Sequence, residues 1–157
     1  MTSMTPEPAS PPEFPSPARE AYPVFTHMTT RWRDDDVYGH MNNVVYYEYF
    51  DTMVNQWLVG TGALSVPDGP VIGLVAETRC RYLASVGFPD KLDIGLSALR
   101  IGRSSVIYGL GLFREGADEA AALCRYVHVY VDAQTRRPTD IPAKMRQCLA
   151  TIAAPTD

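Results

Sequence analysis

Residues 34–59 have the sequence DDDVYGHMNNVVYYEYFDTMVNQWLV, a polar segment followed by a long apolar one. The polar part, from Asp34 to Asn43, combines three consecutive acids with a glycine and two asparagines, which is typical of a loop. From Val44 to Val59 large apolar residues recur at helical spacing and predict one helix. The stripe at helical spacing consists of Val45, Tyr46, Tyr49, Phe50, Met53, Val54, Trp57 and Leu58. Because they occupy most of the circumference, the helix must be enclosed by the rest of the domain.

The segments around this helix predict a β-sheet. β-branched and aromatic residues separated by turn-forming residues favour strands over 24–32, 71–84, 91–102, 104–114 and 121–132, and a short helix over 143–152. One strand, one buried helix and four further strands indicate an α+β domain. We expect an antiparallel five-stranded sheet wrapped around one long central helix.

Proline content divides the chain. Seven of the 13 prolines fall within the first 23 residues, where Phe14 and Tyr22 are the only large hydrophobic side chains. We therefore expect a disordered, Pro-rich tail over 1–21, a single folded domain over 22–152 and a C-terminal tail over 153–157.

Composition argues against several classes of protein. The formal net charge of −4 disfavours a general nucleic-acid-binding protein, which would carry a basic face. No apolar run approaches the roughly 18 residues of a membrane span, and the start carries no secretory signal pattern. The three cysteines, Cys80, Cys124 and Cys148, form no CxxC pair, so we expect small buried hydrophobic residues in a cytoplasmic protein.

The loop before the long helix has the composition of a chemical site. Gly39 permits a tight or positive-φ turn, and Asn42 or Asn43 suits the N-cap of the helix. The unpaired N–H groups of a helix N-terminus can stabilise a developing oxyanion, with a carboxylate from the loop beside them. The alternative is an acidic, solvated turn that only caps the helix.

The segment from Arg31 to Asp51 resembles the signature of hotdog-fold acyl-CoA thioesterases, specifically the 4-hydroxybenzoyl-CoA thioesterase branch. The shared pattern is an aspartate, here Asp36, then Gly-His-Met-Asn-Asn over residues 39–43, then Tyr46 and the pair Tyr49–Phe50. Residues 71–85, 102–106 and 130–138 resemble the second strand, the central turn and the terminal strand of the family. The resemblance covers about residues 22–150 and implies a hotdog fold.

The resemblance also implies catalytic roles. Asp36 matches the carboxylate that serves as general base for water or as nucleophile on the thioester carbonyl. Asn43 matches the position whose backbone N–H polarises that carbonyl. His40 is either an auxiliary catalytic group or a structural histidine bonded to loop backbone. Asp34 and Asp35 are expected to be solvated loop charges.

Further residues are expected to contact the substrate. By the resemblance, Tyr46, Tyr47 and Phe50 would line the tunnel for the acyl group, next to the loop residues Tyr38 and Gly39. Guanidinium groups suit phosphate oxygens, so Arg103 with Ser104, and also Arg136 with Arg137, are candidate contacts for coenzyme A. The resemblance implies a homodimer with joined sheets, or a homotetramer of two such dimers, that needs no metal and no cofactor beyond the coenzyme A thioester substrate.

Two other functions remain open. A hotdog-fold enoyl-CoA hydratase or dehydratase needs an Asp-x-Asn-x-x-His arrangement, which this chain does not display. A non-catalytic acyl-CoA-binding module would bind the thioester without releasing thiol. The acyl group itself cannot be inferred from these residues.

Overall fold

The computed structural model describes residues 10–155 and contains five strands and two α-helices in that range. The elements are β1 (Val24–Thr29), α1 (Asn43–Gly60), β2 (Val71–Tyr82), β3 (Lys91–Ile101), β4 (Ser105–Arg114), β5 (Ala122–Asp132) and α2 (Ala143–Ala150). Two short 3-10 helices cover Arg19–Ala21 and Trp32–Asp34. This order confirms the predicted α+β hotdog architecture.

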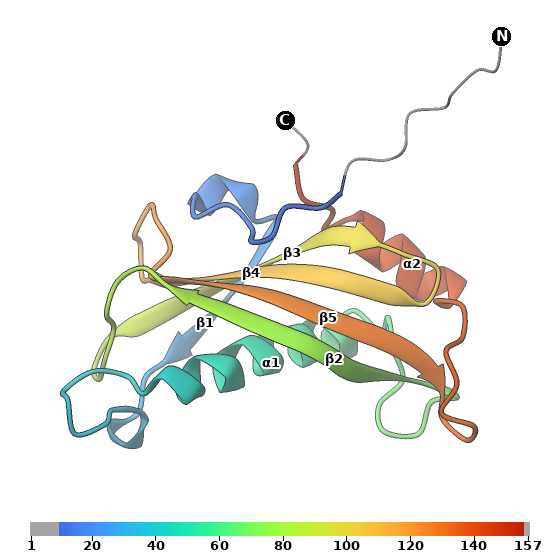
Figure 1. Cartoon of the computed structure of the whole chain (residues 1–157), viewed down its shortest axis with the longest axis horizontal. Helices are drawn as coiled ribbons and strands as arrows, with labels where there is room; N and C mark the ends of the chain where they lie inside the picture. The colour runs from blue at the N-terminus through green and yellow to red at the C-terminus, as the bar shows by residue number, and fades with distance from the viewer. Residues whose placement is uncertain (1–9, 156–157) are drawn as a thin grey trace, which may run out of the picture.

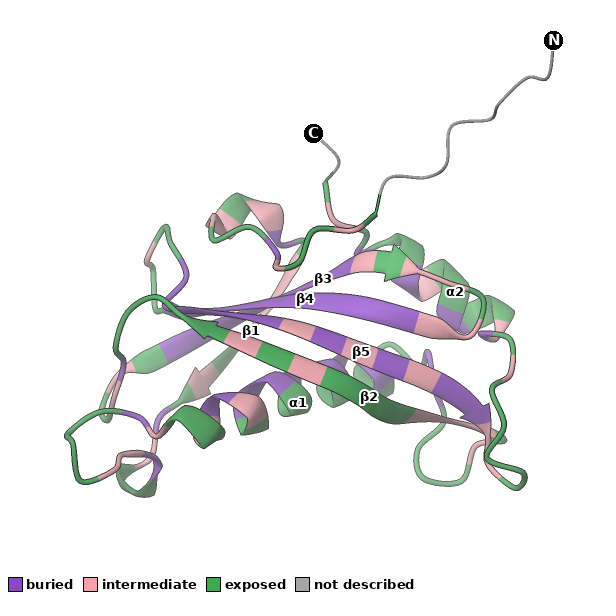
Figure 2. Ribbon diagram, viewed as in Figure 1, coloured by how far each residue is buried: buried purple, intermediate pink, exposed green. Residues whose placement is uncertain are grey.

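All five strands form one antiparallel sheet in the order β1-β3-β4-β5-β2. Helix α1 lies beneath the concave face, and Figure 1 shows the sheet curving over it. The main core joins α1 residues such as Phe50 and Met53 to the inward side chains of the sheet. The two central strands β3 and β4 are buried along most of their length, whereas the edge strand β2 is largely exposed (Figure 2).

The first strand is shorter than the sequence pattern predicts. It ends at Thr29, because Trp32–Asp34 turns into a 3-10 helix. The Asp34 carboxylate accepts the Arg31 N–H at 2.8 Å and holds this turn closed. The β-branched and aromatic residues alone predict a strand as far as Trp32. The buried Asp34 instead closes the 3-10 turn, so β1 ends at Thr29.

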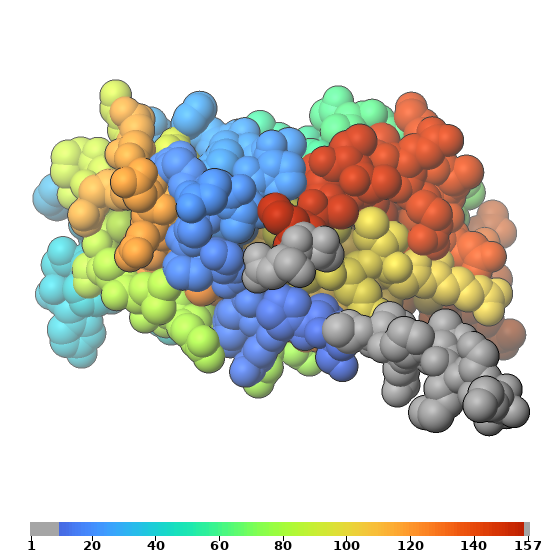
Figure 3. All heavy atoms as spheres, turned by 90° about the horizontal axis from the view of Figure 1, so that it is seen from above, coloured from blue at the N-terminus to red at the C-terminus, as the bar shows by residue number. Residues whose placement is uncertain are grey.

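The N-terminal segment packs on the outer face of the sheet (Figure 3). The ring of Tyr22 lies where a Cβ on Gly95 or Gly111 would come within 3 Å of it. Arg19 forms an ion pair of 2.9 Å with the buried Asp93. Residues 14–21, which were expected to belong to the disordered tail, contact the domain through Arg19 and through Phe14, which packs on the outer-face cluster around Tyr22 and Phe113; residues 1–9 lie outside the described residues.

The C-terminal segment also extends the folded unit. The Ala98 N–H donates to the Ile152 carbonyl at 2.7 Å, and the Ala154 N–H donates to the Ala98 carbonyl at 2.9 Å. The expected boundary after Ile152 thus lies within a stretch that pairs with β3, and residues 156–157 lie outside the described residues.

Candidate active site

A cleft of about 440 Å³ opens where the N-terminus of α1 meets the end of β2. Its lining residues are Asp36, Tyr38, His40, Met41, Asn43, Tyr46, Tyr82, Leu83, Ala84 and Ser85. Five of them, from the loop and the first turn of α1, were predicted as site residues. The structure thus brings Asp36 and Asn43 to one cavity.

A tight turn holds Asp36 in the loop. The Asp36 N–H donates to the His40 carbonyl at 3.1 Å, and the Gly39 N–H donates to the Asp36 carbonyl at 3.2 Å. Gly39 has φ +85°, a conformation that a residue with a Cβ adopts at a cost. The Tyr38 N–H donates to Asp36 Oδ1 at 2.8 Å and orients the carboxylate. No side chain or amide of residues 10–155 donates to the second oxygen, Oδ2, so it remains available to a ligand.

The start of α1 reaches the same cleft through Asn43. Asn42 is the N-cap, and its side chain accepts the Val44 N–H at 3.2 Å. Among the described residues nothing accepts a hydrogen bond from the Asn43 N–H, the first amide of the helix. A free first amide at a helix N-terminus is a donor for developing negative charge.

Tyr82 connects the end of β2 to this helix terminus. Its hydroxyl donates to the Asn43 carbonyl at 3.0 Å, and its ring packs edge-to-face on Tyr46 with centroids 5.0 Å apart. Burial raises the pKa of Tyr82, and the neighbouring Cys80 adds to the rise, so the hydroxyl stays protonated and keeps donating. Tyr82 therefore links the end of β2, which forms one wall of the cleft, to the first turn of α1.

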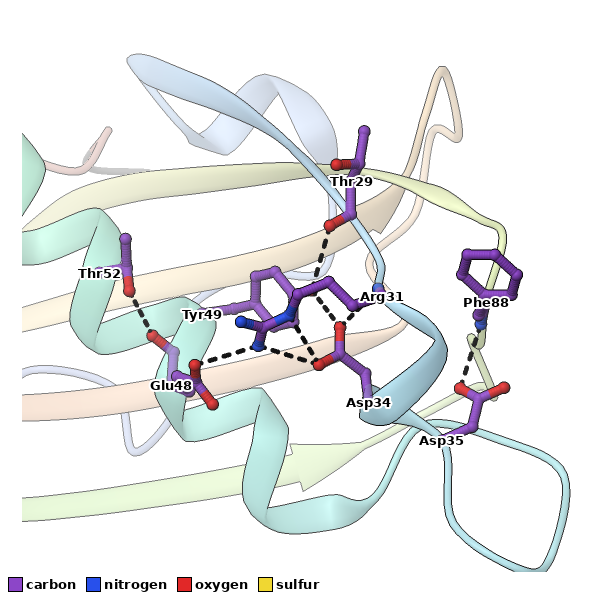
Figure 4. Close-up of polar contacts among 8 residues, drawn as sticks. All are labelled: Thr29, Arg31, Asp34, Asp35, Glu48, Tyr49, Thr52 and Phe88. Carbon is purple, nitrogen blue, oxygen red and sulfur yellow. Dashed lines mark hydrogen bonds and ion pairs between the residues drawn. The ribbon is translucent and has the colours of Figure 1, made fainter.

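Asp34 has a different environment from Asp36, two residues away. Its side chain is 1% exposed, accepts the Tyr49 hydroxyl at 2.5 Å and pairs with Arg31 at 2.9 Å (Figure 4). Arg31 also reaches Glu48 of α1 at 3.0 Å. Although burial alone would raise the pKa of Asp34, the hydrogen bonds from Tyr49 and Arg31 hold it below its usual value. The expectation of a solvated loop charge is wrong for Asp34.

Asp35 binds the loop to the connection between β2 and β3. Its Oδ1 accepts the Phe88 N–H at 3.1 Å, as Figure 4 shows. The backbone of the same loop is held by the Met41 N–H, which donates to the Val86 carbonyl at 2.8 Å. Asp35 is half-buried and structural, which leaves Asp36 as the acid of this run that lines the cleft.

The other loop and helix candidates differ in position. His40 is exposed at the cleft, and its Nδ1 lies 3.5 Å from the Met41 carbonyl. Gly39 shapes the turn and Tyr47 is half-buried on α1, but neither lines the cleft. Phe50 is completely buried in the main core and does not line the cleft.

The predicted phosphate contacts Arg103 and Ser104 do not reach this cleft. They occupy the turn between β3 and β4, at the end of the sheet remote from the N-terminus of α1 (Figure 1). Arg103 pairs there with Asp140 at 2.6 Å. Their expected substrate contacts therefore do not form within a single chain.

The sequence pattern missed the cleft residues at the end of β2. Tyr82 ends β2, which is last in the sheet order, and Leu83–Ser85 follow it; nothing local indicates that this end meets the start of α1. An exposed tyrosine where a strand ends is the one available signal. Only the strand order makes it a wall of the site.

The described residues contain neither a cluster of metal ligands nor a membrane-spanning helix. No group of three or more potential metal ligands comes together in residues 10–155. Neither helix in this range is both long and apolar enough to cross a bilayer.

Comparison with known proteins places the fold in a family. A family model described as the thioesterase-like superfamily matches residues 30–149. The solved structure of the PA5185 protein from Pseudomonas aeruginosa is 47% identical, covers 91% of this chain and all of its own, and superposes with a TM-score of 0.87.

Two more distant structures share the fold. SAV2348 from Staphylococcus aureus, solved in complex with CoA, is 19% identical over 85% of this chain and 86% of its own, with a TM-score of 0.76. Slr0204 from Synechocystis, a 1,4-dihydroxy-2-naphthoyl-CoA thioesterase, is 13% identical over 80% of this chain and 94% of its own, with a TM-score of 0.73. Since the family model spans most of the chain, including the Asp36 loop and α1, this protein belongs to the thioesterase-like superfamily and has its hotdog fold.

Proposed function

We propose that this protein hydrolyses an acyl-CoA thioester to the free acid and coenzyme A in the cleft between the Asp36 loop and the end of β2. One observation carries the proposal: a carboxylate with an unbonded oxygen and an unbonded helix N-terminal amide line the same cavity. Membership of the thioesterase-like superfamily supports the same reaction.

The two groups have complementary roles in thioester cleavage. The Asn43 N–H, with the partial positive charge of the α1 N-terminus, stabilises the oxyanion that forms on the thioester carbonyl. Asp36 either removes a proton from the attacking water or attacks the carbonyl itself. Both routes use the free Oδ2 while Oδ1 stays bonded to Tyr38. Water and these groups suffice, so the proposed reaction needs no cofactor.

The site is proposed to be completed by a second copy of the chain. Strand β2 is the edge of the sheet, and its Leu74 and Val75 are exposed large hydrophobic residues. An exposed apolar edge strand is a template for pairing with another strand. Antiparallel pairing of two β2 strands reverses one copy, so the start of β2 in one subunit lies beside Tyr82 of the other.

This arrangement supplies cations for an anionic substrate. Val71, at the start of β2, pairs with Asp132, and the exposed Arg136 and Arg137 follow directly after β5. In the proposed dimer this end of each subunit adjoins the cleft of the other. The CoA complex of SAV2348, a protein of the same fold, supports coenzyme A as the anionic part of the substrate. The three free thiols support a cytoplasmic location.

A thiol-release assay over a panel of acyl-CoA substrates tests the proposal. The wild type is expected to release coenzyme A from at least one member, and Asp36→Asn to release none above background. Glu20→Gln, at an exposed acid in the 3-10 helix on the outer face of the sheet, is the matched control and should retain full activity. Hydration of an enoyl-CoA without thiol release would instead indicate a hydratase, and saturable binding without turnover would indicate a binding module.

A further inference from the structure

Two of the three cysteines face each other on neighbouring strands. Cys80 of β2 is the register partner of Cys124 of β5, and both are free thiols. Side chains alternate between the faces of a sheet, so Cys80 lies on the same face as Tyr82 and opposite to Arg79 and Arg81. The thiol pair is thus on the core side of the sheet, where Cys80 packs against the main core.

The neighbouring hydrogen bonds define the type of this cross-strand pair. The Leu83 N–H donates to the Ala121 carbonyl at 2.8 Å, the pattern that flanks a non-hydrogen-bonded pair at Tyr82 and Ala122. The register is continuous back to Cys80, and pair types alternate, so Cys80 and Cys124 form the same type of pair. Such pairs have Cα atoms about 4.5 Å apart, at the short end of the range that disulfides span.

The two thiols differ in access and in acidity. Cys124 is completely buried, whereas Cys80 is half-buried. The neighbouring Cys124 thiol holds the pKa of Cys80 below its usual value. The Cys80 thiol, together with burial, raises the pKa of Cys124. An accessible, thiolate-forming cysteine beside a second thiol is the arrangement of a redox-sensitive site.

We propose that Cys80 and Cys124 are an oxidation site that forms a reversible disulfide on reaction with a peroxide. The Cys80 thiolate attacks one peroxide oxygen, the O–O bond breaks, and Cys80 becomes a sulfenic acid as the first water leaves. The Cys124 sulfur then attacks the Cys80 sulfur, the S–O bond breaks, and a second water leaves. Two thiols supply two electrons, so one hydrogen peroxide is reduced to two molecules of water.

This site adjoins the cleft but stands independently of the proposed hydrolysis. Cys80 lies two residues before Tyr82 on the same face of β2, and the Tyr82 hydroxyl donates to the Asn43 carbonyl. A thiol reductant that reaches the half-buried Cys80 sulfur can reopen the disulfide by thiol–disulfide exchange, which makes the change reversible. Drawing Cys80 toward Cys124 would shift the end of β2 that forms the cleft wall.

The test is peroxide treatment of the folded, full-length protein, followed by thiol counting and peptide mapping under non-reducing conditions. The titre of free thiols is expected to fall from three to one, with a linked peptide pair containing Cys80 and Cys124 and full recovery on reduction. Cys148→Ser, which removes the thiol on α2, should form the same link. Cys124→Ala should instead accumulate a sulfenic acid at Cys80 that dimedone traps.

Three results would overturn the proposal: a thiol titre that stays at three under excess peroxide, a disulfide that uses Cys148, or sulfinic acid at Cys80 without a link. Circular dichroism before and after treatment verifies that oxidation acts on the folded chain. Because the readout is covalent, this proposal can fail while thioester hydrolysis holds, and the reverse is also possible.

Discussion

Asp34 and Asp36 lie two residues apart in one loop, yet they differ in burial and in hydrogen-bond partners. Asp34 is buried and bonded to Arg31 and Tyr49, whereas Asp36 lines an open cleft with one oxygen unbonded. The first acid fixes the loop against α1, and the second is left for chemistry. The comparison teaches that neighbouring carboxylates acquire opposite roles from the partners that the tertiary structure supplies.

The same contrast recurs in two other residue types. His128 is buried beside the Tyr130 hydroxyl at 3.0 Å, whereas His40 is exposed at the cleft. Tyr49 donates to buried Asp34, whereas Tyr82 donates to the Asn43 carbonyl at the cleft wall. Substitutions within each pair therefore separate stability from activity.

The largest effect is expected from Asp36→Asn. Removing a general base or nucleophile should lower kcat for thioester hydrolysis roughly 1,000-fold, which corresponds to about 4 kcal/mol in the barrier. Its free energy of unfolding should stay within about 0.5 kcal/mol of the wild type, because no buried contact is lost. Steady-state kinetics and urea unfolding measure the two quantities, and a kcat above a tenth of the wild-type value would refute the role of Asp36.

The reciprocal change is Asp34→Asn. It leaves Arg31 without its buried partner and should reduce the free energy of unfolding by about 3 kcal/mol. Urea unfolding near neutral pH measures this loss, with Asp36→Asn as the matched control. Equal stability of the two variants would contradict the division of roles within the loop.

The pH dependence of the free energy of unfolding tests the burial of His128. Burial lowers the pKa of His128 from 6.5 to about 4, so below pH 6.5 the unfolded chain takes up a proton that the folded chain refuses. The stability from neutral His128 is complete above pH 6.5 and is lost as the pH falls toward 4. Between pH 7.5 and pH 5 the loss is about 2 kcal/mol.

Unfolding curves at several pH values measure this slope. His128→Gln should flatten it between pH 7.5 and pH 5, and His40→Gln is the matched control at an exposed histidine. If both variants kept the wild-type slope, burial of His128 would not be its source.

The smallest effect is expected from Tyr82→Phe. Loss of the hydrogen bond to the Asn43 carbonyl, worth about 1 kcal/mol, should lower kcat roughly fivefold with KM little changed, since the ring remains as cleft wall. Tyr49→Phe loses a comparable bond to Asp34 and should reduce stability without this change in kcat. A rise in KM alone for Tyr82→Phe would show that the hydroxyl contacts substrate instead of positioning the helix.

Much of the fold follows from local patterns. The predicted strands over 71–84, 91–102, 104–114 and 121–132 each end within two residues of the observed ones, because Gly, Pro and Asp turns bound them. The long helix was predictable because its apolar residues cover most of its surface. The first strand and the N-terminal tail were not, since Asp34 and Tyr22 act through partners distant in the sequence.

The candidate site was predictable only in part. Asp36 and Asn43 belong to one contiguous motif, so a loop that leads directly into a helix places them only seven residues apart. Tyr82 and the neighbouring Ala84 reach the cleft because β2 is last in the sheet order, which no local pattern encodes. Arg103 was expected nearby, but the same strand order places it at the other end of the sheet.

The sequence alone determined the long helix with its N-terminus, four of the five strands and the motif that carries Asp36, because these depend on residues close together in the chain. Only the tertiary structure decided which acid is buried, which strand end closes the cleft and which cysteines face each other. Those outcomes depend on burial and cross-strand register, and both are set by segments tens of residues apart.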